Sequence, residues 1–209
     1  MKIRSHRLFP KFIDEWIEIK NSIADWKKRE FLDNSPQFIK QKVLLRHGIN
    51  DAPWIETGTY KGTTTSFLSD FFPHVYSIEP EPSLYKSACE NFKGKNVTLF
   101  NDVSENILPS LLPHMKGSIN FWLDGHYSSG ITFKGDKDCP VEEELNAIKE
   151  NIDNFGNVCI LIDDVRCFVG DKPEFSDYPS IDYLVDWSRN LSLSWQIVHD
   201  IFVIKGKIT

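Results

Sequence analysis

Short hydrophobic runs alternate with amphipathic stretches along most of this chain. Each run has the length of a buried strand, and each stretch repeats its hydrophobic positions every three or four residues. Strands that alternate with helices in this way are typical of a parallel sheet with helical crossover connections. The predicted strands cover residues 54–56, 75–79, 96–101, 118–124 and 158–164, and the predicted helices cover residues 63–72, 84–92, 107–114, 141–155 and 179–190.

The last two strand-like runs, 194–200 and 201–206, follow one another almost without a gap. A connection this short cannot cross over a sheet, so these two strands must be antiparallel. An ordinary NAD-binding domain would keep its sixth strand parallel. The sequence therefore predicts an α/β fold: a Rossmann-like, seven-stranded, mostly parallel sheet with helices on both faces and an antiparallel C-terminal hairpin.

Residues 8–47 are predicted to be helical, because hydrophobic side chains recur there at three- and four-residue spacing. The Ser-Pro pair at residues 35–36 suits the start of a second helix. We expect an N-terminal helical extension over residues 1–50 and the main domain over residues 51–209. The extension is a passive layer on the sheet, a cap on the active site or a subunit contact. The last alternative would make the protein a homo-oligomer.

Composition and charge narrow the class of protein. The chain has 209 residues, of which 41% are hydrophobic and 26% charged, which fits one well-buried domain. Its net charge of −6 argues against nucleic acid as a partner, because phosphates are negative. No hydrophobic run approaches the ~20 residues that span a bilayer, and the basic N-terminus lacks the hydrophobic core of a signal peptide. We therefore expect a cytoplasmic protein without a membrane span.

The segment WIETGTYKGTTT, residues 54–65, has the pattern of a nucleotide-binding turn. A strand that ends in an acid passes into a glycine turn and then directly into a helix, and a second strand ends about twenty residues later at Glu79. Gly58 and Gly62 let the backbone approach a ligand where a Cβ would collide. A carboxylate at the position of Glu79 can accept hydrogen bonds from both hydroxyls of a ribose.

Carboxylates end four of the five predicted parallel strands. They are Glu56, Glu79, Asp124 and the pair Asp163-Asp164. Because ligands of open α/β sheets bind beyond the carboxyl ends of the strands, all five acids should lie at the ligand-binding edge. Packed there without compensation they would repel one another and raise their own pKa values. We therefore expect cationic groups among them.

These residues resemble the class I S-adenosylmethionine-dependent methyltransferases. Within that class the chain is similar to the metal-assisted sugar O-methyltransferases of the macrocin type, over roughly residues 54–205. The resemblance implies that the glycine turn holds the amino-acid end of the cofactor, that the helix after it faces the cofactor carboxylate, and that Glu79 binds the ribose. The expected cofactor-binding residues are Glu56, Gly58, Thr59, Gly62, Thr64, Glu79, Asp102, Ser104 and Asp124.

The segment after the third strand departs from the family pattern. Family members often carry Gly-Asp-Ser there, with the Asp near the adenine. This chain has Asn101-Asp102-Val103-Ser104, so Asp102 stands one place early while Ser104 keeps its place. An N-cap for the next helix is an equally good interpretation of Ser104.

The resemblance also implies a metal site. In the macrocin-type enzymes an Asp after strand four and an Asp-Asp pair after strand five hold one divalent cation. The matching residues here are Asp124, Asp163 and Asp164. Such an all-oxygen set suits Mg²⁺ or Mn²⁺ and not zinc. A metal would acidify a coordinated sugar hydroxyl, as it does bound water.

The base that takes the hydroxyl proton is either Asp124 or His126. His126 has a suitable unperturbed pKa, and it is equally suited to hold a metal ligand through a hydrogen bond. Residues 128–140 form an insertion relative to the family pattern, which is either a lid or a passive loop. Arg166 either contacts an acidic acceptor or pairs with the Asp163-Asp164 pair.

The sequence thus predicts an S-adenosylmethionine-dependent O-methyltransferase that acts on a hydroxyl of a sugar or glycan. Catechol-like or polyketide hydroxyls are alternative small-molecule acceptors. An NAD-dependent oxidoreductase is a further alternative, since Glu79 also suits an NAD ribose, but the turn is not G-x-G-x-x-G. A binding domain without catalysis is the last alternative.

Overall fold

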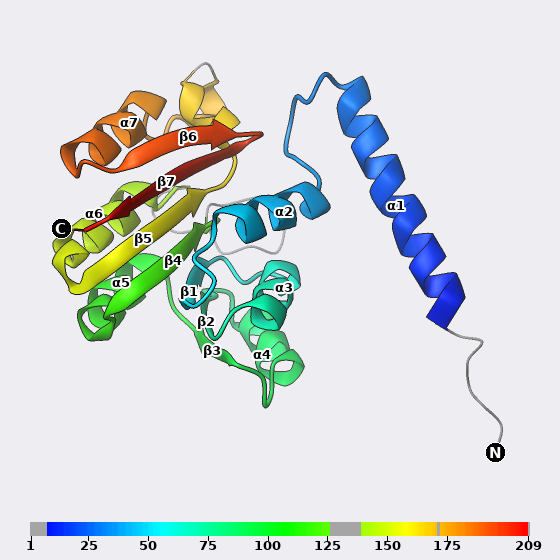
Figure 1. The fold of residues 1–209 in the computed structure, drawn as a ribbon, viewed down its shortest axis with the longest axis horizontal. Coiled ribbons are helices and arrows are strands. Elements are labelled where there is room, and N and C mark those ends of the chain that lie inside the picture. Colours follow the sequence, from blue (N-terminus) through cyan, green and yellow to red (C-terminus); the bar gives the residue numbers. More distant parts are fainter. Residues whose placement is uncertain (1–7, 126–138, 171, 209) are drawn as a thin grey trace.

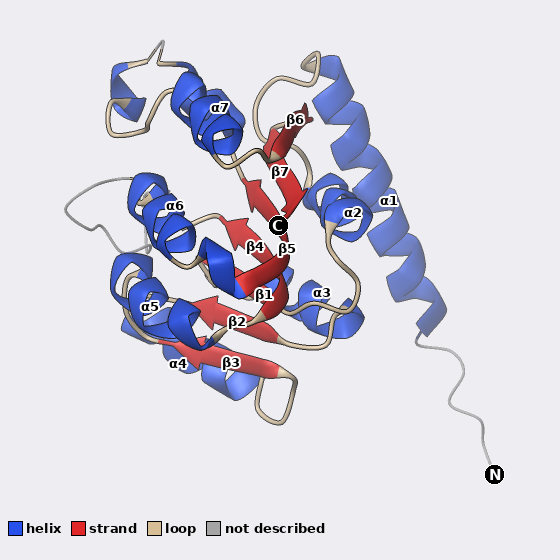
Figure 2. Ribbon diagram, turned by 60° about the vertical axis from the view of Figure 1, so that its left-hand side comes forward, coloured by secondary structure: helices blue, strands red, loops and turns tan. Residues whose placement is uncertain are grey.

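Seven strands form one sheet in the order β3-β2-β1-β4-β5-β7-β6 (Figures 1 and 2). The computed structural model describes residues 8–125, 139–170 and 172–208. Strands β1 to β5 run parallel, and β7 lies antiparallel between β5 and β6, which confirms the predicted architecture. The strands are β1 (Trp54–Thr57), β2 (Val75–Ile78), β3 (Val97–Phe100), β4 (Gly117–Leu123), β5 (Phe155–Ile162), β6 (Ser194–Val198) and β7 (Ile201–Lys207).

Helices precede the sheet and connect its strands. The α-helices are α1 (Leu8–Lys28), α2 (Gln37–His47), α3 (Thr63–Phe71), α4 (Pro82–Asn91), α5 (Ser104–Leu111), α6 (Val141–Glu150) and α7 (Ile181–Asn190). Short 3₁₀ helices cover Leu112–His114, Ile152–Asn154, Val165–Val169 and Pro173–Phe175. None of the helices in the described part of the chain combines the length and hydrophobicity needed to cross a membrane.

Two predicted helix bounds were wrong. Helix α5 begins at Ser104 and not at residue 107, because the Asp102 carboxylate accepts hydrogen bonds from the Val103 N–H and the Asn106 amide at the helix start. Helix α6 ends at Glu150, about five residues early, and β5 begins at Phe155 beside Gly117 of β4. Pairing with neighbouring strands therefore overrides the helical pattern of this segment.

The central strands β1, β4 and β5 bury both of their faces, and their side chains divide by alternation into two cores. In β5, Ile160 and Ile162 face a core shared with α5, α6 and α7, while Cys159 and Leu161 face the core on the side of α2. Helices α2 and α3 cover this second face of the sheet, opposite α5, α6 and α7 (Figure 2). The predicted three-layer arrangement is confirmed.

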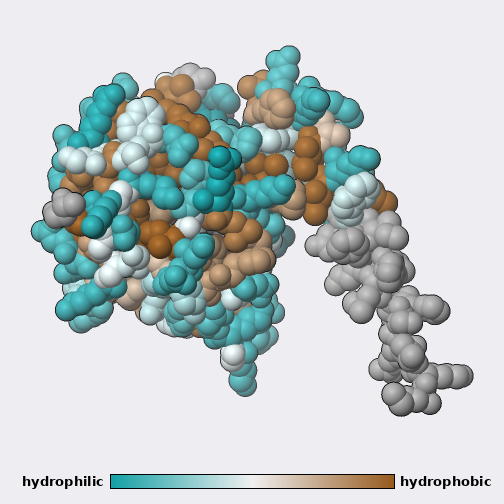
Figure 3. Space-filling model, in the orientation of Figure 1, coloured by the Kyte–Doolittle hydropathy of each residue, from teal (hydrophilic) through white to brown (hydrophobic). Residues whose placement is uncertain are grey.

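The N-terminal helices meet the domain in different ways. Helix α1 projects beside the sheet, with only its C-terminal end close to it (Figures 1 and 2). There the buried Trp26 packs edge-on against the rings of Phe31 and His199. Trp16 is 55% exposed, and hydrophobic side chains show on the surface of α1 (Figure 3). Helix α2 instead lies on the sheet, so only part of this segment is a packed layer.

Candidate active site at the carboxyl edge of the sheet

The turn after β1 requires glycine for two independent reasons. Gly58 has φ +87°, in the left-handed region that disfavours side chains. A Cβ on Gly58 would lie 2.5 Å from the backbone oxygen of Asp124, so the turn packs directly against the end of β4. Gly62 has φ +75° immediately before α3. Tyr60, between them, also has a positive φ of 49°. The Gly58 and Thr59 N–H groups donate to the Ile78 carbonyl, which holds the turn against the end of β2 immediately before α3 begins.

Glu79 lies buried against this turn. Its Oε2 accepts a hydrogen bond of 2.6 Å from the Tyr60 N–H, and its Oε1 accepts one of 2.9 Å from the Glu81 N–H. These bonds fix the plane of the carboxylate at the tip of β2. Burial raises the pKa of Glu79, although the two amide hydrogen bonds oppose this.

A chain of buried hydroxyls connects the turn to Glu56. Glu56 Oε2 accepts hydrogen bonds from Thr65 Oγ1 at 2.5 Å and Ser77 Oγ at 2.6 Å. Since the Ser77 hydroxyl donates to Glu56, the Thr59 hydroxyl, 2.6 Å away, must donate to Ser77. Thr59 therefore holds the turn to β2 with its side chain. Burial raises the pKa of Glu56 to about 8, and its Oε1 has no hydrogen-bond partner in the described part of the chain.

The residues after β3 are arranged for helix capping. Asp102 is exposed, and the hydrogen bonds at its carboxylate belong to the start of α5. Ser104 is the first residue of α5, and Val103 occupies the N-cap position without a side-chain bond. The N-cap interpretation of Ser104 is therefore wrong, and the Asp102 carboxylate, one residue before the N-cap, accepts the side-chain hydrogen bonds at the start of the helix instead. The roles of both residues beside an adenine stay predictions.

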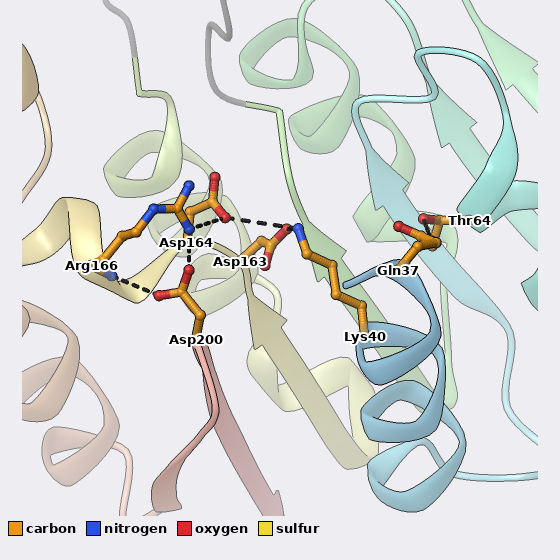
Figure 4. A network of polar contacts seen from close by, with 7 residues as sticks. All are labelled: Gln37, Lys40, Thr64, Asp163, Asp164, Arg166 and Asp200. Carbon is orange, nitrogen blue, oxygen red and sulfur yellow. Dashed lines mark hydrogen bonds and ion pairs between the residues drawn. The ribbon is translucent and has the colours of Figure 1, made fainter. Parts of the chain in front are cut away.

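Helix α2 reaches both halves of this edge (Figure 4). At its first residue, the Gln37 amide donates a hydrogen bond of 3.0 Å to Thr64 Oγ1 in the first turn of α3. One turn later, the Lys40 ammonium donates to Asp163 Oδ2 and lies 3.8 Å from Asp164 Oδ1. The side chain of Lys40 is 12% exposed and that of Asp163 is fully buried. Lys40 thus lies inside the row of acids.

Arg166 is the second cation of this cluster. Its Nη1 lies 2.6 Å from Asp164 Oδ1 and also pairs with Asp200 Oδ2, and its backbone N–H donates to Asp200 Oδ1 at 2.9 Å (Figure 4). Of the two sequence interpretations, pairing is the one observed, with Asp164 and not with Asp163. Asp200 comes from the turn between β6 and β7, so Arg166 ties this hairpin to the end of β5.

Lys40 and the neighbouring aspartates shift one another's pKa values. Burial by itself lowers the pKa of Lys40, but Asp163, Asp124 and Asp164 together raise it well above its ordinary value. Lys40 is therefore charged throughout the physiological range. Burial and the nearby Asp124 raise the pKa of Asp163, while Lys40 lowers it. The acids expected at this edge are thus neutralised in part by side chains of the chain itself.

The predicted metal ligands lie at the same edge of the sheet, but one oxygen of Asp163 and one of Asp164 are engaged by cations. Lys40 donates a hydrogen bond to Asp163 Oδ2, and Asp164 Oδ1 lies within ion-pair distance of both Lys40 and Arg166. Among residues 8–125, 139–170 and 172–208, no group of three His, Cys, Asp or Glu side chains is arranged to hold a metal ion. Asp163 Oδ1 is buried without a hydrogen-bond partner in the described part of the chain. As the side chains stand, they nevertheless do not fit a divalent cation, because an ion bound to the pair at about 2.0–2.1 Å would lie beside the charged groups of Lys40 and Arg166.

Part of the predicted site lies outside the described residues. His126, the alternative base, belongs there, as do residues 128–138 of the insertion. Three side chains of the cluster were missed by sequence reasoning: Gln37, Lys40 and Asp200. A lysine and a glutamine one turn apart in an amphipathic helix carry no signal of their own, and Asp200 is an ordinary turn residue in sequence.

This fold has known counterparts. The N-methyltransferase NodS from Bradyrhizobium japonicum WM9 superposes with a TM-score of 0.53 at 11% identity, over 81% of this chain and 94% of that chain. The 23S rRNA methyltransferase ErmE superposes with a TM-score of 0.52 at 14% identity, over 84% of this chain and 69% of that chain. The chain therefore has the Rossmann-like fold of the class I S-adenosylmethionine-dependent methyltransferases. No protein-family model and no curated protein sequence matches it.

Proposed function

We propose that this protein is an S-adenosylmethionine-dependent methyltransferase that methylates a hydroxyl of a sugar or glycan. The observation that carries the proposal is the turn at Gly58, which leaves no room for a Cβ against Asp124 and lies beside the oriented carboxylate of Glu79. The residues present fit the cofactor: the N-terminus of α3, directly after the turn, suits its carboxylate, and Glu79 suits its ribose. Thr59 and Gly62 belong to this turn, Glu56 is connected to it through the Ser77 hydroxyl, and Thr64 lies in the first turn of α3.

The fold leaves the acceptor open, because proteins of this shape act on different substrates. NodS is an N-methyltransferase and ErmE a 23S rRNA methyltransferase. The acids at the end of β4 and β5 favour a neutral polyhydroxyl acceptor over an rRNA, since carboxylates accept hydrogen bonds from hydroxyls and repel phosphates. The net charge of −6 points the same way. A catechol-like or polyketide hydroxyl offers the same chemistry and is the second acceptor class.

Methyl transfer requires alignment of the acceptor oxygen with the methyl group and removal of its proton. The bound cofactor supplies a methyl group already activated by positive sulfur. Asp124 follows β4, and its backbone oxygen lies against Gly58 of the turn. Its carboxylate is close enough to Glu56 and Asp163 to raise the pKa of both. We assign it the role of proton acceptor, with His126 as the alternative.

We further propose that residues 1–50 cap this site rather than form a passive layer. Gln37 of α2 contacts Thr64 in α3, the helix that faces the proposed cofactor site, and Lys40 of α2 contacts Asp163. Both contacts support this interpretation. Divalent-metal assistance stays a prediction that the described side chains do not favour. The oligomeric state also stays open.

The test is ligand binding followed by turnover. Isothermal titration with S-adenosylhomocysteine should show one site, and NAD should show none. Transfer of labelled methyl from S-adenosylmethionine should then be measured with a sugar panel, catechol and rRNA, each with EDTA or with Mg²⁺. Binding of NAD without S-adenosylhomocysteine would refute the class of enzyme, and labelling of rRNA alone would refute the acceptor.

A further inference from the structure

The acid cluster already contains a cation that belongs to the chain. The Lys40 ammonium contacts Asp163 and Asp164, and its charge is also felt by Asp124. These are the three carboxylates that the sequence assigns to a divalent metal. Arg166 occupies the far side of Asp164 and turns toward Asp200 (Figure 4).

The position of Lys40 is determined by the packing of α2. Val43 and Leu44 are buried in the core on this face of the sheet, and Leu44 lies one turn after Lys40. The loop after α2 is held by the buried Asn120. Its Oδ1 accepts a hydrogen bond of 2.8 Å from the Ile49 N–H, and its amide group donates to the Ile49 and Ala52 carbonyls. The helix therefore cannot slide without breaking buried contacts.

An ammonium and a divalent metal cannot share these oxygens. A magnesium-type ion binds carboxylate oxygens at about 2.0–2.1 Å in a full octahedral shell. The Lys40 ammonium is already in hydrogen-bond contact with Asp163 Oδ2, so an ion there would meet a positive charge at contact distance. One of the two must leave for the other to bind.

We propose that Lys40 is the resident cation of the acceptor site, a positioning residue whose ammonium holds the strand-end aspartates in place of a divalent metal. The role of Lys40 in an acceptor site rests on the proposed function. The replacement of a metal ion by the Lys40 ammonium can be tested by metal binding, without measuring turnover. With Lys40 present, Asp163 and Asp164 keep their orientation beside Asp124 and the enzyme needs no added metal. Without Lys40, the three acids should rearrange around a divalent cation to replace the lost positive charge.

The experiment compares the full-length wild type with Lys40→Met and with Lys42→Met, an exposed control on the same helix whose ammonium lies over the Phe38 ring. Mn²⁺ binding is measured by electron paramagnetic resonance, and the unfolding midpoint is measured with Mn²⁺ and with EDTA. Wild type and Lys42→Met should bind at least tenfold more weakly than Lys40→Met. At roughly a hundredfold excess over its Kd, Mn²⁺ should raise the Lys40→Met midpoint by about 5–10 °C.

Further variants separate a charge role from simple packing. Lys40→Arg should behave as wild type, because it restores the cation. Lys40→Met with Asp163→Asn should lose the Mn²⁺ response, because one carboxylate is removed. A wild-type protein that binds Mn²⁺ tightly and is stabilised by it would overturn the proposal, even if Lys40→Met fails to fold. A Lys40→Met protein that folds and ignores Mn²⁺ would also overturn it. Binding of S-adenosylhomocysteine, measured in parallel, tests the proposed function separately.

Discussion

Gly58→Ala tests the cofactor turn where the structure is most specific. The substitution adds one methyl group, in a left-handed conformation, 2.5 Å from the backbone oxygen of Asp124. Because the atom in the way belongs to the backbone and not to the end of a flexible side chain, the turn or the end of β4 must move. Both of these segments line the proposed cofactor site.

The magnitude follows from two separate contributions. A left-handed φ costs an alanine about 1–2 kcal/mol, offset by about 0.4–1 kcal/mol because alanine also restricts the unfolded chain. Overpacking adds about 1–3 kcal/mol. We therefore expect Gly58→Ala to lower the free energy of unfolding by about 2–4 kcal/mol, which most domains of this size tolerate.

The matched control is Gly94→Ala. Gly94 has φ +77°, close to that of Gly58, but a Cβ there meets nothing within 4 Å. This variant isolates the conformational strain, and we expect it to lose about 0.5–1 kcal/mol. Urea unfolding of both variants gives the stability, and isothermal titration with S-adenosylhomocysteine gives the affinity.

Gly58→Ala should bind S-adenosylhomocysteine at least about tenfold more weakly than wild type, since displacement of the turn removes more than one hydrogen bond worth about 1 kcal/mol each. Gly94→Ala should bind normally. If the two variants are equally stable and bind equally well, the close approach of the turn to Asp124 has no part in cofactor binding, and the central observation behind the proposed function is refuted.

Three further predictions concern buried polar groups. Glu79→Gln should weaken S-adenosylhomocysteine binding roughly 10- to 100-fold in calorimetry, because a charged hydrogen bond is lost, while Glu81→Gln, at the N-cap of α4, should not. The pKa of Glu56 is raised from 4.5 to about 8, so its contribution to stability is complete below pH 4.5 and declines as the pH rises through 8. Relative to Glu56→Gln, the wild type should lose up to about 1.4 kcal/mol per pH unit in urea unfolding across that window, and a constant difference would contradict this. Asn120→Ala should lower the free energy of unfolding by about 2–4 kcal/mol and speed amide exchange in the loop before β1, whereas the exposed Asn157→Ala should change neither measurably.

The parallel sheet was predictable because its signals are local. The parallel strands contain short hydrophobic runs, amphipathic helices connect them, and the short connection between β6 and β7 leaves only an antiparallel pair. The glycine turn was predictable for the same reason, since Gly58 and Gly62 mark positive φ where side chains are disfavoured. The bounds of α5 and α6 could not be predicted. The start of α5 depends on the hydrogen bond that Asp102 accepts there, and the end of α6 depends on the pairing of Phe155 with Gly117 in the sheet.

The origin of the positive charge was not predictable from the sequence, although the need for it was. Crowded carboxylates at the strand ends require cations, but Coulomb's law does not say whether a ligand or a distant side chain supplies them. Lys40 is 123 residues from Asp163, and in sequence nothing separates it from Lys42. Burial of Val43 and Leu44 decides which lysine of α2 faces the sheet. A row of acids in a sequence therefore predicts a positive partner, and only the packing of the neighbouring helix shows that the chain brings its own.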